Sequence, residues 1–200
     1  SLRTVTLSAS PLDGESPPQS IHFRVRLMSV LRVNDFRDLH DLDPSDESLD
    51  TDRATPGEQI TLRSALQLAN LREGMDRIVF GVPSQGNPHI ALQSPLPEIT
   101  GPIVIDGTIL SETGTSQVEI SGQDLPAGNR NNGMVLSGGG STLRGLSFTR
   151  FRSTAFGEIP SPLPPNPSGI LLRGEGGNRV EDCLLGLSPP GESGAGNEGY

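Results

Sequence analysis

The sequence predicts an all-β protein built as a parallel β-helix, a solenoid in which short strands stack from one coil to the next. The first observation is a pattern of apolar, any, apolar, any and glycine that occurs four times, at residues 103–107, 118–122, 134–138 and 170–174. The second is a longer repeat, because residues 133–148 and 169–185 are two versions of one unit. Without an insertion at 152–168, the period is about two dozen residues, which is typical of solenoids.

Each copy of the pattern predicts a strand with one buried face. Side chains on a strand alternate between its two faces, so Ile103 and Ile105 point one way while Asp106, and Glu119 in the second copy, point outward. The glycine then ends the strand where the chain takes a conformation that a Cβ would resist. The stretch 152–168 is rich in proline and polar residues, which predicts a loop inserted into the repeat.

The segments before the repeat predict an N-terminal piece and a short helix. Residues 1–30 contain β-like runs at 4–8 and 21–28, and we expect them to cap the β-helix or to end a preceding domain. Residues 31–200 then form the N-terminal portion of the β-helix. A helix is expected at about 61–70, with Thr61 as its N-cap. Its apolar stripe consists of Leu62, Ala65, Leu66 and Ala69.

The start of this helix resembles a known motif. Residues 60–65 read Ile-Thr-Leu-Arg-Ser-Ala and, with Leu-Ala-Asn at 68–70, resemble the CSLREA motif of bacterial parallel β-helix repeat proteins. Segments 76–80, 96–100, 103–107 and 141–146 resemble those that follow the motif. Ile60 stands where the family has cysteine. Ser64 stands where it has glutamate, so we expect the capping box with Thr61 to be lost.

This resemblance implies a right-handed parallel β-helix of the pectin-lyase-like fold in a secreted or cell-surface protein. It implies a rod or binding surface and no fixed catalytic set. The broader fold also includes polysaccharide lyases and hydrolases, and the lyases commonly use calcium. We expect further coils beyond Tyr200.

Charge and composition exclude some classes of function. The net charge is −9 and no basic stripe with interleaved aromatic residues is present, which argues against nucleic-acid binding. The sequence contains no run of about 18 apolar residues, so it predicts no transmembrane helix. The single cysteine, Cys183, excludes an internal disulfide and occupies the repeat position of Leu146, which predicts a small buried side chain.

An acidic stretch is the candidate metal site. Calcium takes several oxygen ligands at flexible spacing, and a carboxylate-rich loop can supply them. The alternative is a solvated acidic loop. The candidate calcium ligands are Asp41, Asp43, Asp46, Asp50 and Asp52.

Two functions follow from these observations. The first is a non-enzymatic secreted or cell-surface module that acts as a structural rod or adhesion surface for other surface proteins or polysaccharide. Its open end could also pair end to end with another copy. The alternative is a carbohydrate-active enzyme with outward carboxylates, whose candidate residues are Asp106, Glu119, Asp182 and Arg173. We favour the first, because any soluble β-helix needs outward polar residues.

Overall fold

The computed structural model describes most of the chain, with short gaps. The described residues are 2–9, 19–26, 28–46, 48–81, 83, 88–111, 114–126, 132–152, 167–189 and 196–197. Of the predicted insertion at 152–168, only residues 152, 167 and 168 belong to this part of the chain.

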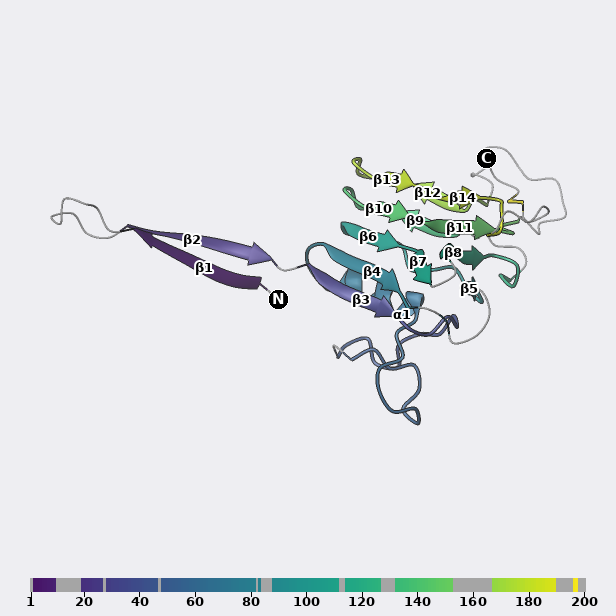
Figure 1. The fold of residues 1–200 in the computed structure, drawn as a ribbon, viewed down its shortest axis with the longest axis horizontal. Helices are drawn as coiled ribbons and strands as arrows, with labels where there is room; N and C mark the ends of the chain where they lie inside the picture. The colour runs from purple at the N-terminus through teal and green to yellow at the C-terminus, as the bar shows by residue number, and fades with distance from the viewer. Residues whose placement is uncertain are drawn as a thin grey trace.

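Parallel strands make up the body of the molecule (Figure 1). The first sheet has the strand order β13-β10-β6-β4-β3, with all neighbours parallel. Its strands are β3 (Ser29–Val33), β4 (Asp76–Phe80), β6 (Ile103–Asp106), β10 (Thr142–Arg144) and β13 (Arg179–Glu181). Strands that are up to 150 residues apart along the chain, from β3 to β13, therefore belong to one sheet.

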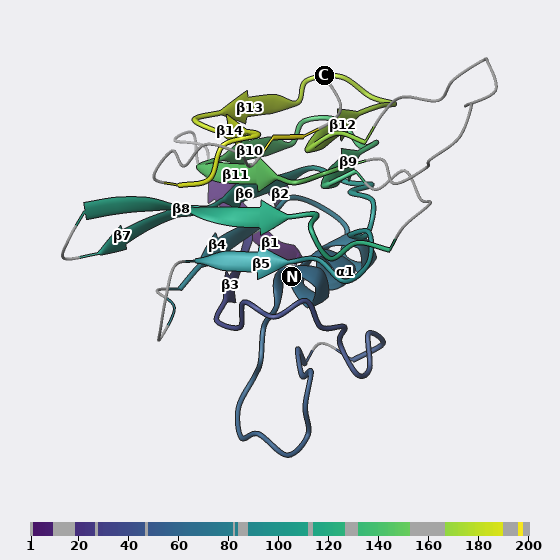
Figure 2. The same cartoon turned by 90° about the vertical axis from the view of Figure 1, so that its right-hand side faces the viewer.

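Two further parallel sheets lie beside the first. The second sheet, which faces the viewer in Figure 2, has the order β14-β11-β8-β5. Its strands are β5 (His89–Ala91), β8 (Gly114–Ser121), β11 (Leu146–Thr149) and β14 (Leu184–Leu185). The third sheet pairs β9 (Met134–Leu136) with β12 (Ile170–Leu172).

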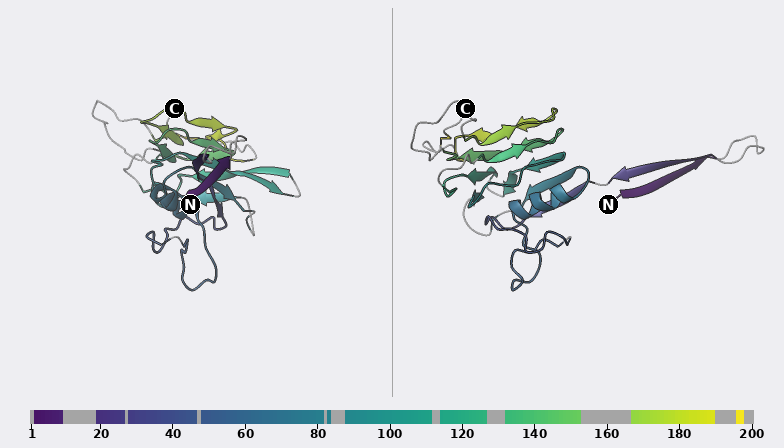
Figure 3. Two further views of the ribbon diagram at one scale, coloured as in Figure 1. Left: turned by 90° about the vertical axis from the view of Figure 1, so that its left-hand side faces the viewer. Right: turned by 180° about the vertical axis from the view of Figure 1, so that it is seen from behind.

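Two antiparallel pairs complete the strands. β1 (Leu2–Ala9) and β2 (Gln19–Arg26) form a hairpin, as the two β-like runs predict. This hairpin projects away from the sheets in Figures 1 and 3. β7 (Thr108–Ser111), which the sequence analysis missed, pairs with the first half of β8.

The predicted right-handed parallel β-helix is wrong. The strands that the structure describes lie in three separate parallel sheets, none of them closed or wound into a solenoid, and two other pairs are antiparallel. The four glycine-ended copies are also not equivalent, because they fall in β6, β8, β9 and β12, which belong to three different sheets. The pattern identifies a strand with one buried face, but it does not specify the neighbour with which that strand pairs.

Strand register confirms the longer repeat, in which residues 133–148 and 169–185 are two versions of one unit. Met134 lies beside Ile170, and Leu143 lies beside Val180. Phe148 likewise lies beside Leu185, in the second sheet. The two versions of the unit are therefore neighbours in all three sheets.

The apolar side chains of the three sheets and the helix form one core. Helix α1 (Leu62–Leu71) packs beside β3 and β4, and Figure 3 shows it against the lower part of the sheets. The predicted stripe is confirmed, with Leu62, Ala65 and Leu66 buried and Ala69 packed against the core. Burial of this stripe fixes the helix more firmly than propensity could, because isolated helices of this length are marginal in water.

The predicted loss of the capping box at α1 is also wrong. The backbone N–H of Ser64 donates to Thr61 Oγ1 at 3.0 Å, and the backbone N–H of Thr61 donates to Ser64 Oγ at 3.0 Å. Both residues are buried. A short hydroxyl side chain therefore closes the same reciprocal pair of bonds that glutamate would make.

Candidate functional site

The outer face of the first sheet carries an ion-pair cluster centred on Asp106. Register places Asp106 of β6 beside Val79 of β4 and Arg144 of β10. Its Oδ2 accepts from Arg77 Nη2 at 3.1 Å and from Arg144 Nη2 at 2.5 Å. Its Oδ1 accepts from the backbone N–H of Thr108 at 3.2 Å. Guanidinium groups from the strands on both sides therefore hold one carboxylate.

Asp106 was predicted to point outward, yet its side chain is only 8% exposed. Burial raises the pKa of Asp106, but the hydrogen bonds from Arg144 and Thr108 and the charge of Arg144 outweigh it, and the pKa lies below its ordinary value. Near neutral pH this group is an ionised acceptor. It suits an ion pair that ties strands together rather than a general acid.

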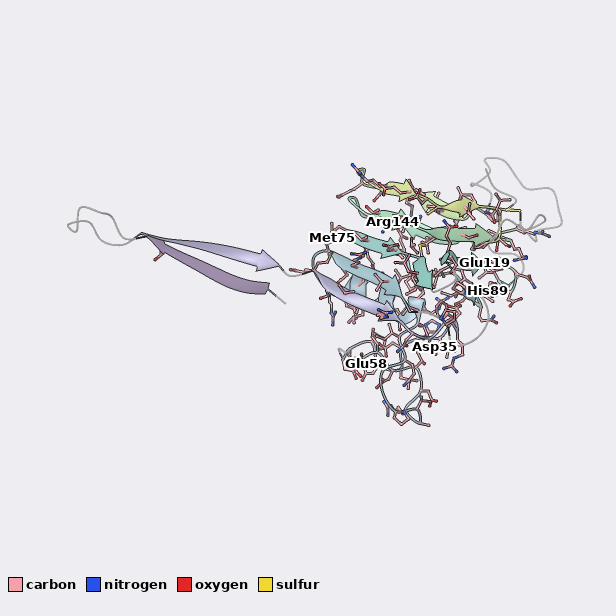
Figure 4. The ribbon with its side chains drawn as sticks, in the orientation of Figure 1. Asp35, Glu58, Met75, His89, Glu119 and Arg144 are labelled. Atoms are coloured by element: carbon pink, nitrogen blue, oxygen red, sulfur yellow. The ribbon has the colours of Figure 1, made fainter. Side chains whose placement is uncertain are left out.

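The second sheet holds a comparable cluster at Glu119, on β8. Oε1 of Glu119 accepts from Thr149 Oγ1 at 2.7 Å, from Arg150 Nη1 at 2.8 Å and from Ser188 Oγ at 3.1 Å. His89 of β5 lies directly beside Glu119 in register, and Figure 4 shows the two at the same edge of the molecule. This carboxylate therefore connects three strands and the segment that follows β14.

The environment of Glu119 keeps it ionised. Burial raises its pKa, but hydrogen bonds from Thr149 and Ser188 and the charges of His89 and Arg150 act in the opposite direction. The net result is a pKa below the ordinary value for glutamate. Glu119 thus resembles Asp106 in its electrostatics, although it lies in a different sheet.

Arg150 connects this cluster to a cavity. It has a φ of 58°, in the left-handed region that non-glycine residues adopt at a cost of about 1–3 kcal/mol. The cavity has a volume of about 270 Å³ and is lined, in the described part of the chain, by Gly122, Gln123, Leu125, Arg150 and Arg152. Toward described residues, Arg150 donates from Nη1 to Glu119 Oε1 and to Thr149 Oγ1.

The remaining sequence candidates lie elsewhere. Arg173, just after β12, donates from Nε to Glu98 Oε1 at 3.1 Å and from Nη2 to Glu98 Oε2. Asp182 has a φ of 49°, and its backbone carbonyl accepts from Gln117 Nε2 at 2.6 Å. Of the four candidates of the enzyme hypothesis, Asp106 lies in the first sheet and Glu119 in the second, whereas Arg173 follows β12 and Asp182 lies between β13 and β14. Figure 4 shows Arg144, the partner of Asp106, away from Glu119 and His89.

The candidate calcium ligands are used within their own loop. Asp43 Oδ1 accepts from the Ser45 backbone N–H at 3.1 Å, and Asp52 Oδ1 accepts from the Ala54 backbone N–H at 2.8 Å. Asp46 accepts from the Ser48 backbone N–H in the same manner. Among the described residues, no three His, Cys, Asp or Glu side chains are grouped so that they could hold a metal ion. The role of Asp41, Asp43, Asp46, Asp50 and Asp52 as calcium ligands stays a prediction.

The sequence predicts a small buried side chain at Cys183. It is half-buried against the core, and burial raises the pKa of its thiol. Sequence reasoning missed Arg150, Ser188 and Glu98 as site residues. Arg150 follows a strand as an ordinary polar residue, and Ser188 meets Glu119 across 69 positions, so no local signal marks either of them.

The fold and these clusters define a class: a protein of short parallel strands whose outer faces are bridged by arginine–carboxylate pairs, with an arginine-lined cavity. No protein-family model, curated protein or solved structure matches the chain. In the described part of the chain, the structure contains no helix with the length and apolar character needed to cross a membrane.

Proposed function

We propose that the chain is a non-enzymatic module of a secreted or cell-surface protein, which acts as a structural rod and as an interaction surface. The observation that carries this proposal is the state of the carboxylates. Asp106, Glu119 and Glu98 each pair with arginine, and each has a lowered pKa. Such groups link neighbouring segments and hold their charge over a wide range of pH.

Acid–base catalysis needs a different arrangement. A glycosidase uses two carboxyl groups at a fixed separation, and the pKa of its acid is raised so that it carries a proton near neutral pH. Asp106 and Glu119 lie in different sheets, and both have lowered pKa values. This electrostatic pattern favours the structural role over the enzyme alternative.

The interaction surface that we propose is the cavity beside Arg150. Arg150, Arg152 and Gln123 are among the residues that line a space of about 270 Å³. Arginine presents a planar fork of donors that matches the two oxygens of a carboxylate. The expected ligand is therefore a carboxylate group, carried by a uronic acid in a surface polysaccharide or by an acidic side chain of a surface protein.

The test combines binding with product analysis. The chain is mixed with oligogalacturonate and with a poly-glutamate peptide, and binding is measured by calorimetry while the mixtures are analysed for new reducing ends and unsaturated products. We expect binding to one of these ligands and no products. Arg152→Gln should weaken binding by about tenfold or more. The control Arg53→Gln changes an exposed arginine in another loop and should leave binding unchanged.

Two outcomes would contradict the proposal. Cleavage products that disappear in Glu119→Gln, with the melting temperature retained, would establish the enzyme alternative. If neither ligand binds, the cavity is not the interaction surface.

A further inference from the structure

The outer face of the first sheet carries two rows of side chains that cross all five of its strands. In register, the first row consists of Arg32, Val79, Asp106, Arg144 and Glu181. The second row consists of Val30, Arg77, Val104, Thr142 and Arg179. Both rows point away from the core, because the residues between them on the strands, such as Ile78 and Ile105, are fully buried. We call these two rows the arginine face.

The arginine face reverses the charge of the chain. The whole sequence has 24 acidic and 15 basic residues, whereas the two rows contain four arginines and two acids. The strands of the second sheet, in contrast, contain Glu119 and no arginine. A local excess of positive charge attracts anions even where the net charge of the molecule is negative. This face is therefore suited to an anionic ligand.

The acid at the centre of the face lies beneath the arginines. The side chain of Asp106 is 8% exposed, whereas those of Arg77 and Arg144, which bind it, are 39% and 45% exposed. Arg179 is 74% exposed, and Arg32 is exposed as well. A ligand that approaches the face thus meets guanidinium groups before the carboxylate. The ion pairs with Asp106 also hold two of these groups in place, which reduces the entropy that binding must remove.

The layout of the face indicates the shape of the ligand. Neighbouring strands lie about 4.8 Å apart, so the arginines on β3, β4, β10 and β13 follow one another over about 19 Å across the sheet. The backbones of β4, β6 and β10 are paired on both sides, so the face offers side chains and not main-chain groups. A peptide that binds by adding a strand needs an open edge instead. The face thus fits a linear polymer with charges on successive units.

We propose that the arginine face binds a linear anionic polysaccharide, which lies across the strands and is held through the oxyanions of successive sugars. The planar donor fork of arginine matches a carboxylate and similar oxyanions. Uronic acids and sulfate esters both supply such groups. The two rows contain no aromatic residue, so charge and not ring stacking provides the recognition. Figure 4 shows Arg144 away from Glu119, the partner of Arg150, so this surface is separate from the cavity and goes beyond the proposed function.

Binding is measured by calorimetry with polygalacturonate, with heparin and with neutral dextran. We expect at least one of the two anionic polymers to bind, with an affinity that falls as salt is added, and dextran not to bind. The polymer that binds more tightly identifies carboxylate or sulfate as the preferred group. Binding of neither anionic polymer, or binding that salt does not weaken, would overturn the proposal. Poly-glutamate that binds more tightly than both would show that the partner is an acidic protein instead.

A single substitution tests the face without removing any of its ion pairs. Thr142→Glu places an acid in the second row and leaves the four arginines and Asp106 unchanged. It should weaken binding about tenfold or more, because the new carboxylate repels the ligand at the centre of the face. Thr142→Gln is the matched control, since it adds an uncharged side chain of the same length, and it should bind as the wild type does. Equal binding by the two variants would count against the face.

A double variant removes charge from the same surface. Arg32→Gln combined with Arg179→Gln neutralises two exposed cations and should also weaken binding about tenfold or more. The control combines Arg37→Gln with Arg53→Gln, which neutralises two exposed cations in the segment between β3 and α1. The melting temperature of each variant is measured beside its affinity. An equal loss of affinity in the two double variants would show that net charge, and not this face, governs binding.

The cavity and the face are distinguished by repeating the measurements in an Arg152→Gln background. This change alters the cavity, and polymer binding at the arginine face should persist. If the background change alone abolishes polymer binding, the cavity carries all of it, and the present inference is wrong while the proposed function stands. If binding persists and Thr142→Glu then removes it, the face is established whether or not the cavity binds a ligand.

Discussion

Arg63 and Asp38 form a bidentate ion pair whose two side chains are 2% and 1% exposed. Arg63 Nε donates to Asp38 Oδ1 and Arg63 Nη2 donates to Asp38 Oδ2, both at 2.8 Å. The same guanidinium donates to the carbonyls of Ser94 and Pro95, and Asp38 also accepts from the backbone N–H of Gln93. One residue on the helix thus joins two loops that are distant in sequence. Arg63 belongs to the motif that resembles CSLREA, and its role here is to organise the fold.

Removing one partner of this pair should be strongly destabilising. Arg63→Met leaves Asp38 buried and without its cation, and the loss of a partner from a buried pair costs about 3–5 kcal/mol. Urea unfolding followed by circular dichroism measures the change. The matched control is Arg37→Met, which breaks a pair with Asp35 in which the arginine is 64% exposed. That change should cost about 1 kcal/mol or less. Similar losses in the two variants would contradict the structural role of Arg63.

The capping box at Thr61 and Ser64 predicts a smaller effect. Ser64→Ala removes the hydroxyl that accepts from the Thr61 N–H, which leaves a buried donor without that partner. The expected loss is about 1 kcal/mol, as for other helix caps. The melting temperature measures it, with exposed Leu71→Ala as the control in the same helix. No difference between the two variants would show that the box adds nothing.

Gly107 is required by space and not by backbone conformation, which corrects the expectation from sequence. A Cβ at Gly107 would overlap the side chain of Leu146, and it would lie 2.6 Å from the carbonyl of Gly145. Gly107→Ala should therefore destabilise the chain by about 1–3 kcal/mol. Gly101→Ala is the matched control, because a Cβ there meets no atom within 4 Å. Chemical denaturation compares the two, and an equal effect would refute the steric reason.

Acid should weaken the fold through Asp106 and Glu119. Both have pKa values below normal in the folded chain, so their stabilising effect is complete above the unfolded-state values of about 4. It declines as the pH falls through the lower folded values, because folding must then release protons that the unfolded chain binds. Melting temperatures measured from about pH 7 down to about pH 2 report this loss of stability, because that range covers the titration of carboxylates. Glu119→Gln should flatten the profile, and an unchanged profile would refute the assignment.

The sequence predicted local elements well and long-range contacts poorly. The helix near Thr61 and the strand at Asp76 were predicted because their signals, a cap and an alternating pattern, lie within a few residues. The bond from Ser64 to Thr61 was missed because the resemblance suggested that only glutamate could make it. The pairing of Arg150 with Glu119 was missed because 31 residues separate them and neither has a local signal.

Alternating apolar residues and strand-ending glycines therefore determined by themselves where strands form and which face of each is buried. The repeat formed by residues 133–148 and 169–185 also determined that these two units are neighbours. Only the tertiary structure decided that the strands lie in three separate sheets, that two pairs are antiparallel, and that outward Asp106 and Glu119 are covered by arginines. The physical reason is range: periodicity reports the burial of one strand, whereas strand partners and ion pairs depend on residues that meet only when the chain has folded.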